Sequence, residues 1–224
     1  MLKFNNCIGA GFINRCYSTK RLTNAQRDSF SVTPDLHNTL IGLILGDLYI
    51  SRQSKNAILR FEQGSIHEAY ILHLYDLFKD YCGSGLKYSD RKPDLRTGKI
   101  YSRIIFTSYS LPCFNDYHEL FYENKIKRIP LNIGELLRPV GLAYWAMDDG
   151  NKKDKNFKLS TYSYTLNEVE LLIKVLKENF DLNCTSQLWM KDKYTIYIKS
   201  DSMDKFRSLV TPHFHESMMY KLAI

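Results

Sequence analysis

The chain has 224 residues, 44% of them hydrophobic, with 16 tyrosines and 12 phenylalanines, a composition that excludes an intrinsically disordered protein. Its net charge of +7 favours a polyanionic partner, nucleic acid before a membrane. Five cysteines without a CxxC pair predict reduced thiols in a non-secretory compartment and argue against a zinc site.

The N-terminal segment is basic. Residues 1–27 contain five lysines and arginines and no acidic residue. Such a segment, acid-free and weakly amphipathic, is typical of a mitochondrial transit peptide, so we expect cleavage after Tyr17 and a location in the mitochondrial matrix. The alternative is that residues 1–30 form a basic arm that contacts the DNA backbone.

A first apolar run, LIGLILGDL at residues 40–48, has an aspartate at its eighth position, Asp47. Thr33 and Pro34 suit the N-cap and first turn of a helix, which predicts that the run is helical. Gly42 and Gly46 stand four residues apart and would share one helix face. The run is too short to span a membrane, which needs about 20 apolar residues.

Alternating strands and helices are predicted after this run. Ser65 and Glu68 have capping-box spacing, which predicts a helix over 66–81. A later helix is predicted over 111–125, before a basic linker at 125–139. The predicted strands of this half cover residues 49–52, 57–63, 86–88 and 99–107.

The second half repeats the order. A second apolar run, LAYWAMDDG at 142–150, predicts a helix over 140–149 with Asp149 at the eighth position. Thr165 and Glu168 form a second capping box, which opens a helix that runs to Asn179. The remaining predicted elements are strands at 157–162, 184–189 and 194–199 and a helix at 202–210.

The two apolar runs carry the first functional hypothesis. If their helices pack through their small residues, Asp47 and Asp149 meet at the two C-terminal ends. The helix dipole and the neighbouring carboxylate both oppose ionisation there, and a hard divalent cation would offset that repulsion. The alternative is two buried core helices that each end in an aspartate as a polar stop.

The two runs resemble the paired motifs of the LAGLIDADG homing endonucleases in their single-chain form, and they are similar to the mitochondrial omega-intron type of yeast. Three flanking segments agree: residues 180–184, 196–198 and 218–222. The resemblance covers Leu36 to Leu222. It implies an α/β (α+β) fold of two pseudo-symmetric αββαββα repeats, at 31–138 and 139–224, forming a saddle of antiparallel sheets.

The same resemblance implies a metal site. Asp47 and Asp149 would be the metal ligands and catalytic residues, holding Mg²⁺ or Mn²⁺ near a scissile phosphate. Asp148 adjoins Asp149, but the motif alignment selects Asp149. The family carries a catalytic lysine near the end of each repeat, which implies Lys127, with Lys125 as a rival, and Lys221.

The predicted strands and turns would contact double-stranded DNA, because a two-stranded ribbon fits the major groove. For each residue alone, the alternative is a solvated surface charge. The candidate contacts are Arg52, Gln53, Lys55, Arg60, Gln63, Arg91, Lys92, Arg96, Arg103, Lys152, Lys153, Lys158, Gln187, Lys191, Lys193 and Lys199.

We therefore expect a monomeric, divalent-metal-dependent, site-specific DNA endonuclease that makes a staggered double-strand break. The alternative is an RNA-binding maturase that assists splicing of a group I intron in mitochondria. A third hypothesis is a basic nucleic-acid-binding relic without activity. A transit peptide favours the maturase, whereas retention of both aspartates favours cleavage.

Overall fold

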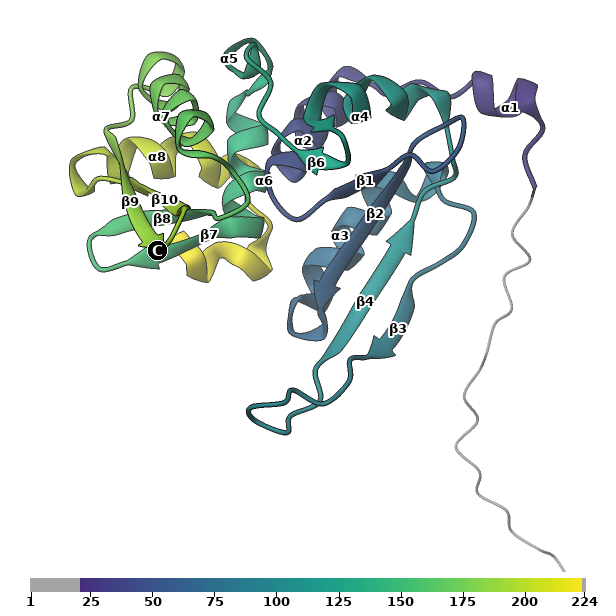
Figure 1. Cartoon of the computed structure of the whole chain (residues 1–224), viewed down its shortest axis with the longest axis horizontal. Helices are drawn as coiled ribbons and strands as arrows, with labels where there is room; N and C mark the ends of the chain where they lie inside the picture. Colours follow the sequence, from purple (N-terminus) through teal and green to yellow (C-terminus); the bar gives the residue numbers. More distant parts are fainter. Residues whose placement is uncertain (1–20, 223–224) are drawn as a thin grey trace, which may run out of the picture.

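The computed structural model describes residues 21–222 and contains two four-stranded antiparallel sheets that lie side by side (Figure 1). Helices pack on one face of each sheet, and two helices stand between the sheets. The predicted mixed fold with a saddle of antiparallel sheets is confirmed. Residues 1–20, with the expected cleavage site after Tyr17, lie outside the described residues.

The first sheet has the strand order β1-β2-β4-β3. Its half of the chain contains α1 (Asn24–Asp28), α2 (Pro34–Leu45), β1 (Tyr49–Ser51), β2 (Ile58–Gly64), α3 (Glu68–Phe78), β3 (Lys87–Asp90), β4 (Ser102–Thr107), α4 (Asn115–Phe121), β5 (Tyr122–Glu123), β6 (Ile126–Lys127) and α5 (Ile133–Leu136).

The second sheet has the matching order β7-β8-β10-β9. Its half contains α6 (Pro139–Asp149), β7 (Gly150–Lys153), β8 (Asn156–Thr161), α7 (Leu166–Phe180), β9 (Cys184–Met190), β10 (Lys193–Ile198), α8 (Met203–Val210) and a C-terminal 3₁₀ segment, η6 (Glu216–Leu222).

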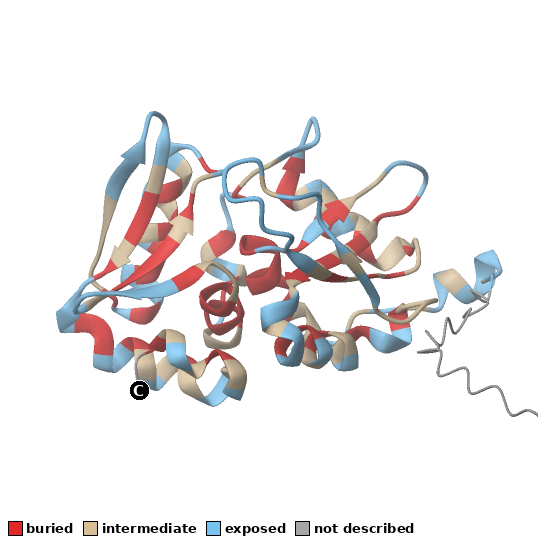
Figure 2. Ribbon diagram, turned by 90° about the horizontal axis from the view of Figure 1, so that it is seen from below, coloured by how far each residue is buried: buried red, intermediate tan, exposed pale blue. Residues whose placement is uncertain are grey.

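Helices α2 and α6 pack against each other at the centre of the molecule (Figure 1). Their backbones approach so closely that a Cβ atom on Gly42 would overlap the backbone of Gly141. The closest partner of Gly42 is therefore Gly141 and not one of the alanines of the second run. Figure 2 shows buried residues gathered in the middle of the molecule and exposed residues on the hairpin loops.

Two helices of the first half differ from the prediction. Residues 65–67 form a 3₁₀ turn without a side-chain cap, and Glu68 accepts a hydrogen bond from Tyr88 Oη (2.8 Å) instead of closing a capping box. The helix expected over 111–125 ends at Phe121, since Asn124 and Lys125 take positive φ angles of 51° and 67° and turn the chain into the β5–β6 hairpin. Lys127 is thereby placed on a strand.

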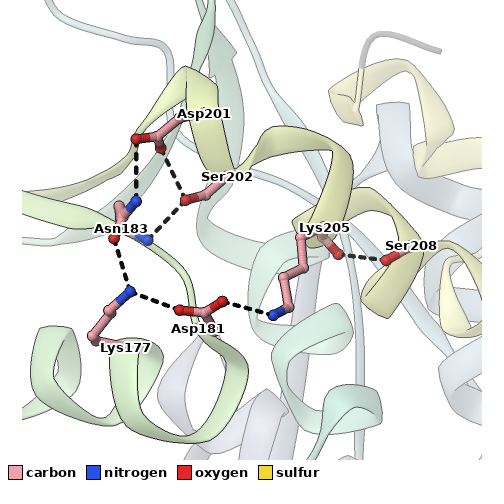
Figure 3. A network of polar contacts seen from close by, with 7 residues as sticks. All are labelled: Lys177, Asp181, Asn183, Asp201, Ser202, Lys205 and Ser208. Carbon is pink, nitrogen blue, oxygen red and sulfur yellow. Dashed lines mark hydrogen bonds and ion pairs between the residues drawn. The ribbon is translucent and has the colours of Figure 1, made fainter.

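The helix caps of the second half follow the sequence. Thr165 and Glu168 form the predicted capping box of α7. This helix ends at Phe180, and its C-cap Asp181 takes a left-handed φ of 53° and binds Lys177 Nζ (2.6 Å) and Lys205 Nζ (2.9 Å) (Figure 3). The two ammonium groups lower the pKa of Asp181 to about 2. This network links α7 to α8.

Within residues 21–222, no helix has both the length and the apolar character needed to cross a lipid bilayer.

Candidate active site

The C-terminal ends of α2 and α6 meet between the two sheets. The backbone N–H of Asp47 donates to Asp148 Oδ2 (3.2 Å), and a Cβ atom on Gly46 would lie 2.6 Å from Asp148 Cβ. Only glycine therefore lets the two helix ends come this close. The geometry brings Asp47 into the neighbourhood of Asp148 and Asp149.

Asp148 points inward. Its Oδ1 accepts a hydrogen bond from Tyr70 Oη (3.0 Å) and a longer one from Gln63 Nε2 (3.5 Å). Burial, followed by the charges of Asp47 and Asp149, holds the pKa of Asp148 well above its usual range, although its hydrogen bonds partly offset this. Asp148 therefore joins the two halves as a structural group, which supports Asp149 as the functional aspartate of the second motif.

Asp149 faces a surface depression whose lining also includes Asn151, Lys152, Ser160 and Lys221. Burial, followed by the charge of Asp47, raises the pKa of Asp149 to about 7, against the attraction of Lys127 and Lys221. Among residues 21–222, no group donates a hydrogen bond to the Asp149 carboxylate. The carboxylate oxygen atoms of Asp149 are therefore available to bind a cation.

Asp47 is exposed and lines a second depression, together with Tyr49, Arg60, Glu62, Gln63 and Arg91. Gln63 Nε2 donates to Asp47 Oδ2 (3.1 Å). Each aspartate therefore stands at the edge of its own depression, next to the sheet of its own half.

A lysine closes the C-terminal end of each central helix, where free carbonyl groups and the helix dipole attract a cation. Lys127 Nζ donates to the Gly46 carbonyl (2.7 Å), and Lys221 Nζ donates to the carbonyls of Met147 and of Asp148 (3.1 Å for the latter). Burial lowers the pKa of both lysines, against the attraction of the neighbouring aspartates. Lys125 stands in the hairpin turn, so Lys127 is the lysine beside the aspartates.

Two of the predicted DNA contacts, Gln63 and Arg52, instead bind carboxylates of the protein itself. Gln63 is 8% exposed and lies against Asp47, because its position on β2 is three residues from Arg60 and so falls on the opposite strand face. Arg52 turns toward α4, where it binds Glu119 (2.5 Å). The role of Gln63 beside Asp47, like that of Tyr70, could not be seen in the sequence, since both contacts depend on the packing of the two halves.

Lys158 is also not a free surface lysine. It is 9% exposed, its Nζ donates to Tyr162 Oη (2.8 Å), and the same Nζ lies 4.3 Å from the centre of the Trp189 ring. The site predicted at Lys158 is therefore an aromatic surface with a cation beneath it.

Three predicted arginines share one acidic partner on the first sheet. Arg60, Arg91 and Arg103 bind Glu62 at 3.0, 2.9 and 3.1 Å. The other predicted contacts are exposed on strands and turns of the two sheets: Gln53, Lys55, Lys92, Arg96, Lys152, Lys153, Gln187, Lys191, Lys193 and Lys199.

The chain matches the model of a known family. The model of the LAGLIDADG DNA endonuclease family matches residues 37–206, so the chain belongs to this family. The resemblance seen in the sequence is confirmed.

Relatives at similar identity carry two kinds of name. The chain is 36% identical over 194 residues to the probable intron-encoded endonuclease 1 of Wickerhamomyces canadensis, covering 82% of each chain. It is 34% identical over 193 residues to the cytochrome b mRNA maturase bI2 of Debaryomyces hansenii, covering 82% of this chain and 71% of the relative. Its fold is similar to that of the homing endonuclease I-WcaI bound to its DNA recognition sequence, with a TM-score of 0.81, 33% identity and coverage of 86% of this chain and 88% of the other.

Proposed function

We propose that the protein is a site-specific DNA endonuclease that makes a staggered double-strand break with the help of divalent cations, Mg²⁺ or Mn²⁺. The observation that carries this proposal is the convergence of Asp47 and Asp149 at the ends of the packed helices α2 and α6, each next to a lysine and a surface depression. Relatives named as intron-encoded endonucleases and a similar fold bound to DNA support it.

The side chains present fit a magnesium site completed by DNA. Among the residues that the structure describes, no group of three or more His, Cys, Asp and Glu could hold a metal by itself. Mg²⁺ is commonly held by one or two carboxylates together with substrate phosphates and water. Asp47 and Asp149 would provide those carboxylates, and the pKa of Asp149 is raised because burial and the charge of Asp47 outweigh the attraction of Lys127 and Lys221. A bound ion would lower the pKa of a water molecule and stabilise the leaving oxygen.

The residues around the aspartates have separate tasks. Lys127 and Lys221 are each anchored to helix carbonyls and, as ammonium groups with three donors, retain N–H groups for a phosphate oxygen. Positive charge fixed at that position stabilises the negative charge that develops during phosphodiester cleavage. Gln63 orients Asp47, and Asp148 fixes the backbone of Asp47.

The same proposal extends to partner, domains and location. Double-stranded DNA would lie on the sheet faces beside the depressions, since two-stranded ribbons fit the major groove. Residues 31–138 and 139–224 would form the two repeats, so that one chain acts as a monomer, with residues 1–30 as transit peptide or basic arm. Cytochrome b mRNA maturases among the relatives support a location in the mitochondrion, in the matrix.

A second function has one specific observation in its favour. The relative from Debaryomyces hansenii is named a maturase, which would make group I intron RNA a partner of this chain. RNA binding alone does not require two carboxylates at the meeting point of the helices. We therefore place endonuclease activity first.

The test combines a cleavage assay and a splicing assay on the same preparations. Wild type should cut duplexes from a randomised library in Mg²⁺ and bind them uncut in Ca²⁺, whereas Asp47→Asn and Asp149→Asn should bind and fail to cut. Asp204→Asn, an exposed aspartate on α8, is the matched control and should cut like wild type.

Two outcomes contradict the proposal. Cleavage by both asparagine variants at the wild-type rate would show that the metal ligands lie elsewhere. A wild type that cuts no DNA but supports splicing of a group I intron, with both variants equally active, would establish the maturase function instead.

A further inference from the structure

The two sheet faces that flank the aspartates have different chemistry. On the second sheet, Ser160 lines the depression of Asp149, so Lys158, two residues away on β8, lies on the same strand face. Lys158 contacts Tyr162 and Trp189, which places both rings on this side too. We call Lys158, Tyr162 and Trp189 the aromatic cluster.

In the aromatic cluster the rings lie outside and the charge lies beneath them. The rings of Tyr162 and Trp189 have centres 6.0 Å apart, and Lys158 Nζ lies 5.3 Å and 4.3 Å from these two centres. Trp189 is 58% exposed, whereas Lys158 is 9% exposed. The ammonium group is already engaged by the Tyr162 hydroxyl and the indole face, so the surface offered to a ligand is mainly apolar.

The corresponding face of the first sheet is polar and positively charged. Glu62 binds three arginines, and its side chain is 23% exposed, whereas those of Arg60, Arg91 and Arg103 are 43%, 56% and 33% exposed. Two net positive charges remain on planar groups with unused N–H donors. Glu62 holds these guanidinium groups in place before any ligand arrives.

Base edges in the major groove differ in the same way. Guanine presents two acceptors that suit an arginine, whereas thymine presents a methyl group that suits an apolar side chain. We propose that the second sheet recognises thymine methyl groups through Trp189 and Tyr162, while the first sheet recognises guanine through the Glu62 arginines. The target then consists of a guanine-containing half and a thymine-containing half. This inference rests on the proposed function, because it takes duplex DNA as the substrate.

The experiment begins with duplexes selected from a randomised library by binding in Ca²⁺. Thymines in each half of a selected duplex are then replaced by uracil, which keeps base pairing and removes only the methyl group. Uracil in the half bound by the second sheet should weaken binding about fourfold for each contacted methyl, since burying one such group is worth about 0.8 kcal/mol. Uracil in the other half should leave affinity unchanged.

Two variants assign the effect to the aromatic cluster. Trp189→Ala should reduce the preference for thymine over uracil, because it removes the more exposed ring of the aromatic cluster, whose contact is to a base and not to a phosphate. Leu188→Ala is the matched control. Leu188 is the preceding residue of β9, is 64% exposed and lies on the opposite strand face, so this variant should keep the preference for thymine.

The outcomes separate this inference from the proposed function. If specific duplexes are selected and cut, but uracil changes affinity in neither half, the inference is wrong and the endonuclease function stands. Equal loss of thymine preference in Leu188→Ala and Trp189→Ala also overturns it. If no duplex is bound specifically, the proposed function fails and the inference fails with it.

Discussion

At the end of α6, the Asp149 carboxyl group occupies a position that disfavours its own ionisation. Its pKa of about 7 lies above the ordinary value for aspartate, so the folded state holds the proton more tightly than the unfolded state. Ionisation therefore lowers stability as the pH rises from about 4 to about 7, and the loss is complete above about 7.

Asp149→Asn should consequently stabilise the metal-free protein in a pH-dependent way. In EDTA, the free energy of unfolding should rise by up to about 4 kcal/mol at about pH 8 and much less at about pH 5, since each pKa unit corresponds to about 1.4 kcal/mol. Urea denaturation at the two pH values measures this, with Asp204→Asn as control. An equal gain at both pH values would contradict the expected titration.

Gln63 offers a second test at the scale of one residue. It donates to Asp47, whereas the residue at the matching position of β8, Thr161, donates to the Tyr194 carbonyl. Gln63→Ala should slow cleavage of one strand by about 10- to 100-fold, as loss of outer ligand-orienting contacts commonly does. Nicked DNA should then accumulate on a gel with a supercoiled substrate. Equal slowing of both strands would show that Gln63 does not act through Asp47 alone.

Among the elements, the α2–α6 pair depends on glycine. Gly42→Ala would place a methyl group into the backbone of Gly141, so the helices must separate, and overpacking of this kind costs about 1–3 kcal/mol. Gly64→Ala is the control, because an added Cβ there has its nearest neighbour at 3.8 Å. Thermal denaturation of both variants measures the difference. If Gly42→Ala is as stable as Gly64→Ala, the close approach of the helices does not limit stability.

The elements also show what the sequence could and could not predict. The start of α2 at Thr33 and of α7 at Thr165 depends on residues within one turn, and both caps were predicted. The sequence predicts a helix over 111–125, which overlaps the start of the β5–β6 hairpin. The hairpin brings Lys127 to the Gly46 carbonyl, 81 residues away, and local sequence does not reveal such a contact.

The site residues also fall into two groups: those that local sequence predicts and those whose contacts depend on the packing of distant elements. The aspartates could be found because they repeat within two similar runs. The sequence predicts both Gln63 and Lys158 as DNA contacts, because it does not reveal that Gln63 donates to Asp47 or that Lys158 lies beneath the Trp189 ring. The contact of Tyr70 cannot be predicted from the sequence either, because its partner, Asp148, lies 78 residues further along the chain.

At the scale of the whole molecule, the charge of +7 should make DNA binding strongly dependent on salt. Lys92 and Lys153 are exposed on turns of the two sheets, so Lys92→Ala and Lys153→Ala should each weaken binding to all sequences alike and reduce the salt slope by about one. Fluorescence anisotropy over a salt series measures the slope. Lys174→Ala, on the helix face of the second half, should leave it unchanged. Unchanged slopes for all three variants would remove these turns from the DNA interface.

The separation of the α2–α6 pair from the sheet faces has a consequence for how such a protein changes over generations. The aspartates that would cut DNA lie at the ends of two buried helices, where substitutions of core residues lower stability. The side chains that would recognise the DNA sequence lie on strands and are exposed to solvent. Substitutions on the strands can therefore accumulate without disturbing the cutting groups. Each half can also drift by itself, because the two sheets share no strand. A lineage built on this plan can acquire a new target one half at a time while its chemistry stays the same.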